Sequence, residues 1–160
     1  MIPLLLLSPF ALAPCALWLG RKPGRAALLA ALPAFLFVYL ASVMGGLAET
    51  GPVLAELPWA PGLGLSLAFN LDGLGLLLAL LITGIGALIV LYASSYLAGH
   101  RQAGRFFAIL FLFMGSMLGV VLSDNLLTMF VFWELTGFTS FLLIGFEHEE
   151  ASSRAAAIQA

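Results

Sequence analysis

Glu134 is the residue of this chain whose type and position point most directly to chemistry. It lies in the segment LLTMFVFWELTGFTSFLLIGF, in which every other side chain is uncharged. It is the ninth residue counted from Leu126, so about 12 Å of helical rise separates it from the start of the segment, close to the middle of a bilayer. A carboxylate that faces lipid there, without a partner, is costly. We therefore expect Glu134 to face protein or water and to lie on a proton or cation pathway.

Neighbours of Glu134 in the sequence are expected to support this site. Gly137 falls on the same helical face and would let another segment approach closely. Hydroxyl groups are expected on the flanks, where they could hold a water molecule: Thr136, Thr139 and Ser140. Burial and a nearby cation act in opposite directions on the protonation of a carboxyl group, so movement of a partner charge can switch it. The alternative interpretation is a neutral glutamic acid that only hydrogen-bonds between helices.

Two aspartates are expected at helix starts. Asp72 precedes a long apolar run, where its side chain could accept hydrogen bonds from the unpaired amides of the first helical turn. The alternative role for Asp72 is an outer port for cations. In the turn Ser123-Asp124-Asn125, we expect either Asp124 or Asn125 to cap the next helix.

The composition requires a membrane protein. Of the 160 residues, 62% are hydrophobic and 9% are charged, whereas about 25% are charged in soluble domains. A helix needs roughly 20 apolar residues to cross the hydrocarbon core. The sequence predicts an all-α, polytopic membrane helix bundle that forms a single transmembrane domain over residues 1–160, with five spans at residues 2–19, 26–46, 73–97, 106–122 and 126–146.

The loops predict the topology. The long loop 47–72 is rich in Gly and Pro, and residues 63–69 alternate apolar and small side chains, which predicts a short strand or hairpin over the outer face. Lysine and arginine occur only in the first loop, the third loop and the segment after the fifth span, whereas the second and fourth loops carry only acidic charge. By the positive-inside rule, the N-terminus is expected outside. Residues 154–160 read as the start of a sixth helix, so we expect the sequence to be a fragment.

Other function classes find little support. The sequence contains no nucleotide-binding loop, no Cys/His metal spacing and no nucleophile elbow, so we expect no cofactor, no metal and no nucleic-acid partner. The run Glu147–Glu150 offers metal ligands but reads as a solvated loop. Cys15 is expected to be an inert packing residue. No lysine lies in any predicted span, so a cationic partner for Glu134 must come from elsewhere.

Two stretches resemble a known family. NLDGLGLLLALLITGIGALIVLYASSYL and SDNLLTMFVFWELTGFTSFLLIGF are similar to the N-terminal region of the A subunit of multisubunit Mrp-type cation/proton antiporters, itself related to the largest antiporter-like subunit of complex I. The resemblance implies that Glu134 matches the family's fifth-helix glutamate, which works with a lysine on a later broken helix. Complex I relatives commonly carry a histidine before the tyrosine of the third span, where this chain has Val90-Leu91-Tyr92, and this favours the Mrp branch.

The resemblance implies a function and its partners. We expect a secondary transporter subunit, not an enzyme, that exchanges sodium or another monovalent cation for protons. It would sit as a multi-pass protein in the bacterial inner membrane, in a hetero-oligomeric complex with other antiporter subunits. One alternative is a proton-translocating subunit of an NADH-quinone oxidoreductase. The other is a truncated membrane piece without activity of its own.

Overall fold

A computed structural model describes residues 1–22, 24–60, 62 and 65–146. Its elements, in chain order, are α1 (Ile2–Leu19), the 3₁₀ helix η1 (Ala26–Ala30), α2 (Ala31–Thr50), β1 (Val53–Ala60), β2 (Leu65–Leu71), α3 (Gly73–Tyr96), α4 (Ala103–Val121) and α5 (Leu126–Ile144). Within the described residues, five helices are long and apolar enough to cross a membrane. The predicted all-α class with about five membrane-spanning helices is confirmed, and the two-stranded sheet is a minor addition to it. The expected start of a sixth helix lies outside the described residues.

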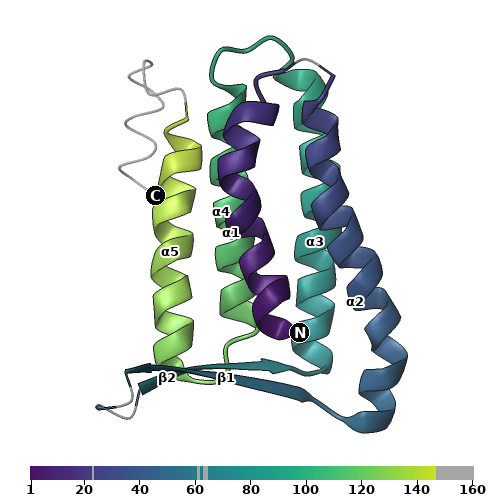
Figure 1. Cartoon of the computed structure of the whole chain (residues 1–160), viewed down its shortest axis with the longest axis vertical. Coiled ribbons are helices and arrows are strands. Elements are labelled where there is room, and N and C mark those ends of the chain that lie inside the picture. The colour runs from purple at the N-terminus through teal and green to yellow at the C-terminus, as the bar shows by residue number, and fades with distance from the viewer. Residues whose placement is uncertain (23, 61, 63–64, 147–160) are drawn as a thin grey trace.

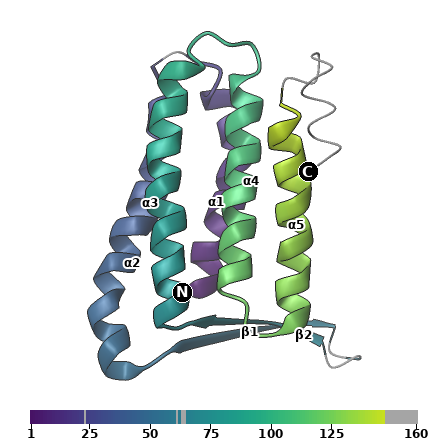
Figure 2. The same ribbon diagram turned by 180° about the vertical axis from the view of Figure 1, so that it is seen from behind.

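The five helices stand side by side, with α5 on one flank and α2 on the other (Figure 1). Helix α4 packs extensively against α1 and α5, while α2 and η1 pack against α3. Seen from behind, α3 and α4 are neighbours and α1 lies behind them (Figure 2). Helix α4 is therefore the element on which α5 is positioned.

Small residues allow the closest contacts of α4. Gly104 lies against the backbone of α1, because a Cβ atom there would meet the carbonyl oxygen of Leu17. The spacing Gly115-Ser-Met-Leu-Gly119 is typical of helix packing, but its two glycines serve different neighbours. Gly115 faces the ring of Phe10 on α1, whereas Gly119 faces the ring of Phe132 on α5. Aromatic rings from two helices thus fill the space that the glycines leave.

The predicted outer hairpin is present and covers one end of the bundle. Strands β1 and β2 pair antiparallel and lie across the ends of the helices (Figure 1). Phe69 and Leu71 of β2 are almost fully buried and belong to the same core cluster as Leu118 of α4 and Leu122, the residue that follows this helix. The hairpin therefore closes the core at this end of the helices.

The two ends of the bundle differ in charge. The described cationic side chains lie in and beside the loops at the end away from the hairpin: Arg21, Lys22, Arg25, Arg101 and Arg105. The described acidic residues other than Glu134 lie at the hairpin end: Glu49, Glu56, Asp72 and Asp124. The N-terminus also lies toward the hairpin end (Figure 1). Since lysine and arginine favour the cytoplasmic side, this polarity agrees with the predicted orientation, in which the hairpin and the N-terminus lie outside.

Candidate functional site

Helix α5 has one face buried against the bundle, and Glu134 lies on the other. The buried residues of α5 are Thr128, Phe132 and Thr139, which share one side of the helix. Glu134 follows Phe132 by two residues, which is a rotation of about 200°, and its side chain is exposed in the described chain. The carboxyl group therefore points away from α4.

The exposed face around Glu134 is otherwise apolar. Large hydrophobic side chains lie on it above and below the carboxyl group, with Phe130 58% and Phe138 61% exposed. Gly137 adds an open position, because no atom of the described residues lies within 4 Å of the place where its Cβ would be. The face thus consists of one carboxyl group and one gap within a hydrocarbon surface.

The hydroxyl groups predicted beside Glu134 are directed elsewhere. The Thr136 hydroxyl donates to the carbonyl of Phe132 at 2.8 Å, and the Thr139 hydroxyl donates to that of Leu135 at 2.7 Å. Both threonines therefore satisfy the backbone of their own helix, and Thr139 is buried on the side that faces the bundle. Ser140 is half-buried, and no described hydrogen bond joins it to Glu134. The structure does not bring these three hydroxyls together with the carboxyl group.

Glu134 has no charged neighbour within the described residues. It is the ninth residue of the 19-residue helix α5 and so lies at mid-span. The described lysine and arginine residues occupy the loops and helix ends at the basic end of the bundle. A cation that balances Glu134 would have to come from a segment that packs on the exposed face of α5.

The two aspartates at the outer end have different roles. Asp72 is the N-cap of α3, and its Oδ1 accepts a hydrogen bond from the Gly75 amide at 2.7 Å. Asp124 does not cap α5. The cap is Asn125, whose backbone is extended and whose Oδ1 accepts from the Thr128 amide at 2.7 Å. Asp124 lies one residue earlier, and its amide donates to the Ala68 carbonyl at 2.9 Å.

The contacts that join the start of α5 to β2 were not predicted from the sequence. The Thr128 hydroxyl accepts from the Ala68 amide at 3.0 Å, and the Asn125 side-chain amide donates to the Ser66 carbonyl at 3.0 Å. In addition, the Asn70 amide donates to the Leu122 carbonyl at 2.8 Å. The pattern Asn125-x-x-Thr128 signals a cap, but nothing local to it predicts a strand as the second partner. These bonds fix the α4–α5 turn against β2.

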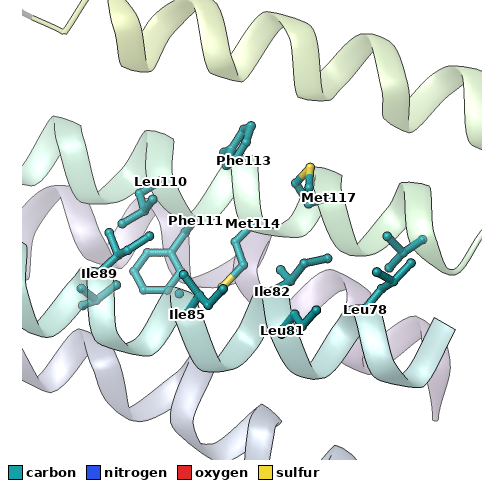
Figure 3. Close-up of a pocket in the computed structure, with 13 residues that line it drawn as sticks. Leu78, Leu81, Ile82, Ile85, Ile89, Leu110, Phe111, Phe113, Met114 and Met117 are labelled. Atoms are coloured by element: carbon teal, nitrogen blue, oxygen red, sulfur yellow. The ribbon is translucent and has the colours of Figure 1, made fainter. Parts of the chain in front are cut away.

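The apolar cavity between α3 and α4 lacks the groups needed for proton transfer. Its volume is about 330 Å³, and its lining side chains are hydrocarbon or thioether (Figure 3). Met114 reaches across it toward Gly86, where an added Cβ would lie 2.9 Å from the sulfur atom. The cavity is on the other side of α4 from the exposed face of α5, and we assign no chemistry to it.

No cluster of three or more potential metal ligands occurs among the described residues. The run Glu147–Glu150, considered above as a weak metal candidate, lies outside the described residues. The expectation that this chain binds no metal stays a prediction.

Two family models match the sequence. Residues 59–107 match the model described as NADH-ubiquinone oxidoreductase (complex I), chain 5 N-terminus. Residues 123–160 match the model described as NADH:quinone oxidoreductase/Mrp antiporter, TM. The chain belongs to this family of antiporter-like membrane subunits. It is accordingly an integral membrane protein, as its five helices also indicate.

Similar proteins of this family carry antiporter names. Na(+)/H(+) antiporter subunit A1 of Staphylococcus haemolyticus is 49% identical over 122 residues, which are 76% of this antiporter-like chain and 15% of that protein. The subunit A1 of Staphylococcus aureus is 48% identical over the same length. The chain thus spans about 15% of the length of the curated relatives it matches.

Solved structures agree with this assignment. A chain of the Mrp complex from a Dietzia species superposes with a TM-score of 0.78 at 34% identity, covering 89% of the antiporter-like chain and 16% of that one. A chain of the membrane-bound sulfane sulfur reductase, an archaeal respiratory membrane complex, gives a TM-score of 0.75 at 24% identity and covers 98% and 24% of the two chains. The second match shows a shared fold alone.

Proposed function

We propose that this chain is part of a subunit of a monovalent cation/proton antiporter in a bacterial plasma membrane, assembled with other antiporter subunits. The names of the relatives at 49% identity support exchange of sodium for protons. Glu134 is the proton-relay carboxyl group in this proposal. The transport pathway as a whole includes segments that pack against α5.

The main support for this proposal is the position of Glu134. A carboxyl group at mid-span on an apolar helix face is tolerated only where protein or water covers it. The open position at Gly137 gives a covering segment access to the carboxyl group, because no described atom occupies that space. A lysine ammonium from such a segment would stabilise the carboxylate, and its withdrawal would favour protonation. Alternation between the two states takes up a proton on one side and releases it on the other.

Mutation of Glu134 in the complete assembly tests this proposal. The assembly is produced in a bacterial host that lacks its own sodium/proton antiporters, and sodium-driven proton movement is measured in inverted membrane vesicles. Glu134→Gln keeps the size of the side chain but removes the titration, so exchange is expected to fall on the order of a hundredfold. Glu134→Asp, which keeps the carboxyl group on a shorter stem, is expected to retain part of the activity.

The matched control is Glu56→Gln on the outer hairpin. It removes the same charge from β1, far from the middle of the membrane, and exchange is expected to stay at the wild-type level. Full exchange and sodium tolerance in Glu134→Gln, with normal amounts of protein in the membrane, would refute the relay role.

A second candidate function is proton translocation driven by a quinone-reducing complex. The complex I description of the first matching family model favours it. The two functions differ in what drives them. Sodium-dependent proton movement in vesicles without a reductant supports the antiporter, whereas proton movement that requires an electron donor supports the redox-driven complex.

A further inference from the structure

Helix α5 is held in the bundle by few side chains. Within the part of the chain that the structure describes, the buried residues among the 19 of this helix are Thr128, Phe132 and Thr139. Helices in a membrane associate through packing and hydrogen bonds, because lipid is as apolar as their side chains. Helix α5 is apolar on nearly every side, so its rotation about its own axis is set by these few contacts and not by hydropathy.

Phe132 makes the contact of α5 that depends most on shape. Its ring fills the space beside Gly119 of α4 in which a Cβ atom would otherwise lie. The same ring packs on Phe69 of β2, which is almost fully buried, and Phe132 itself is only 8% exposed. If α5 turned, the ring would leave the space at Gly119 and lose its contact with Phe69. The fit of this ring therefore favours one rotational setting of the helix.

A polar contact holds the turn of α5 that precedes Phe132. Thr128 lies four residues earlier on the same helical face, and its hydroxyl accepts a hydrogen bond from the Ala68 amide of β2. Thr139 is buried as well, but its described hydrogen bonds run to carbonyl groups of its own helix. Among the described residues of α5, Phe132 is thus the buried side chain nearest to Glu134 along the chain.

The spacing of Phe132 and Glu134 makes the carboxyl group sensitive to this fit. A helical side chain reaches roughly 5–6 Å from the helix axis, so a rotation of α5 by about 20° would displace the carboxyl group by about 2 Å. Misplacement of a reacting group by about 1 Å can lower its reaction rate about a hundredfold. A rotation small enough to leave the bundle folded is therefore large for the transfer of a proton.

We propose that Phe132 is a positioning residue for Glu134. Its ring, packed against Gly119 and Phe69, fixes the rotation of α5, and this rotation sets where the carboxyl group meets the segment that covers it. The inference rests on the relay role of Glu134 proposed above. Phe132 touches neither the proton nor the cation in this account, and it acts only through the helix that carries both residues.

Exchange and chemical labelling of Glu134 in the complete assembly test the proposal. The variant Phe132→Leu loses the ring but keeps an apolar side chain. The matched control is Phe111→Leu, because Phe111 is also a buried ring but lines the cavity between α3 and α4. Sodium-driven proton movement is measured in inverted vesicles per amount of folded assembly. A membrane-permeant carbodiimide, which reacts with protonated carboxyl groups, labels Glu134, and mass spectrometry of the α5 peptide gives the labelling rate.

Both variants are expected to lose thermal stability, since each removes a buried ring. Only Phe132→Leu should lower exchange, by roughly tenfold or more, and alter the labelling rate of Glu134 by about threefold or more, because only this change releases the rotation of α5. Gly119→Ala should also lower exchange, because its methyl group would displace the Phe132 ring. Since ring and glycine share one contact, the loss in the double variant should be smaller than the product of the two single losses.

Three results would overturn the positioning role. The first is wild-type exchange and labelling in folded Phe132→Leu. The second is an equal effect in Phe111→Leu, which would mean that loss of any buried ring is sufficient. The third is a double variant of Gly119 and Phe132 whose losses simply multiply, because the two residues would then act separately.

The same measurements separate this inference from the proposed function. Full exchange in Glu134→Gln refutes the relay role itself. Loss of exchange in Glu134→Gln together with wild-type exchange and labelling in Phe132→Leu refutes only the positioning role.

Discussion

The ring of Phe132 on α5 occupies the space next to Gly119 on α4 in which a Cβ atom would otherwise lie. The same ring packs on Phe69 of β2, with centroids 5.9 Å apart and planes at 60°. One aromatic side chain thus joins α5 to α4 and to the hairpin. Because Phe132 faces the bundle, Glu134 two residues later faces away from it.

Gly119→Ala is expected to destabilise the bundle by roughly 1–3 kcal/mol, because the added methyl group would force the Phe132 ring out of place. The control is Gly137→Ala on the exposed face of α5, where no described atom lies within 4 Å of the position of the added methyl group. Because glycine is unfavourable inside a helix, the free energy of unfolding of this control variant should stay unchanged or rise by about 0.5–1 kcal/mol. Thermal unfolding in detergent measures both. Equal melting temperatures for the two variants would contradict the packing of α5 described above.

Gly137→Leu offers a separate test of the site on α5. In the described chain the side chain has open space, so unfolding should be little affected. In the assembled transporter, a leucine there should keep a covering segment away from Glu134 and lower exchange by roughly tenfold or more. The reason is that displacing a reacting group by about 1 Å can lower its reaction rate about a hundredfold. Exchange in vesicles, compared with Thr136→Ala as control, measures the effect. Wild-type exchange in Gly137→Leu would mean that no segment approaches this face closely.

Gly104→Ala should be more damaging than Gly86→Ala. A methyl group at position 104 would meet the backbone of α1 at Leu17, which cannot rotate away, whereas one at position 86 would meet the flexible end of Met114. Overpacking against backbone is expected to cost about 1–3 kcal/mol, and the methionine can adapt at lower cost. Unfolding in detergent compares the two variants. The reverse order would show that α1 and α4 are not in backbone contact.

The start of α5 depends on Asn125 and not on Asp124. Asn125→Ala removes both the cap on Thr128 and the bond to the Ser66 carbonyl, so a loss of about 1–2 kcal/mol is expected. Asp124→Ala keeps the backbone bond to Ala68 and should be close to neutral. Hydrogen exchange of the first amides of α5 reports the cap directly. Faster exchange in Asp124→Ala than in Asn125→Ala would be inconsistent with this assignment.

Thr128→Val is expected to loosen the hairpin. The change preserves shape but leaves the Ala68 amide without the hydroxyl that now accepts from it, which costs about 1–3 kcal/mol when the group is buried. Thr136→Val is the matched control, because its hydroxyl bonds only to its own helix. Hydrogen exchange at Ala68 should accelerate in the first variant alone. Similar protection of Ala68 in both variants would argue against the bond between β2 and α5.

The spans and the hairpin were predictable because they depend on local properties. A helix in hydrocarbon must satisfy its own backbone and extend through the apolar layer, so length and hydropathy suffice to locate it. The alternation over residues 63–69 likewise predicted extended structure, and β2 occupies Leu65–Leu71. The cap at Asp72 follows from its place before an apolar run, and its bond to the Gly75 amide is present.

The surroundings of Glu134 could not be predicted in the same way. Helix α5 is apolar on nearly every side, so the residue pattern does not choose which face meets α4. The expectation that Thr136 and Thr139 would serve the carboxyl group overlooked their preference for the carbonyl one turn earlier. For neighbouring candidates such as Asp124 and Asn125, side-chain chemistry is nearly equal, and the backbone conformation decides which one caps the helix.

The sequence by itself determined that this chain crosses a membrane and that one carboxyl group lies at mid-span, and it predicted the orientation. These conclusions rest on hydropathy, charge and position along the chain, which are properties of single segments. Only the tertiary structure decided that Phe132 and not Glu134 faces α4, because that choice depends on how an aromatic ring fits the glycine of another helix. Shape complementarity between distant segments left the carboxyl group on the open side of α5.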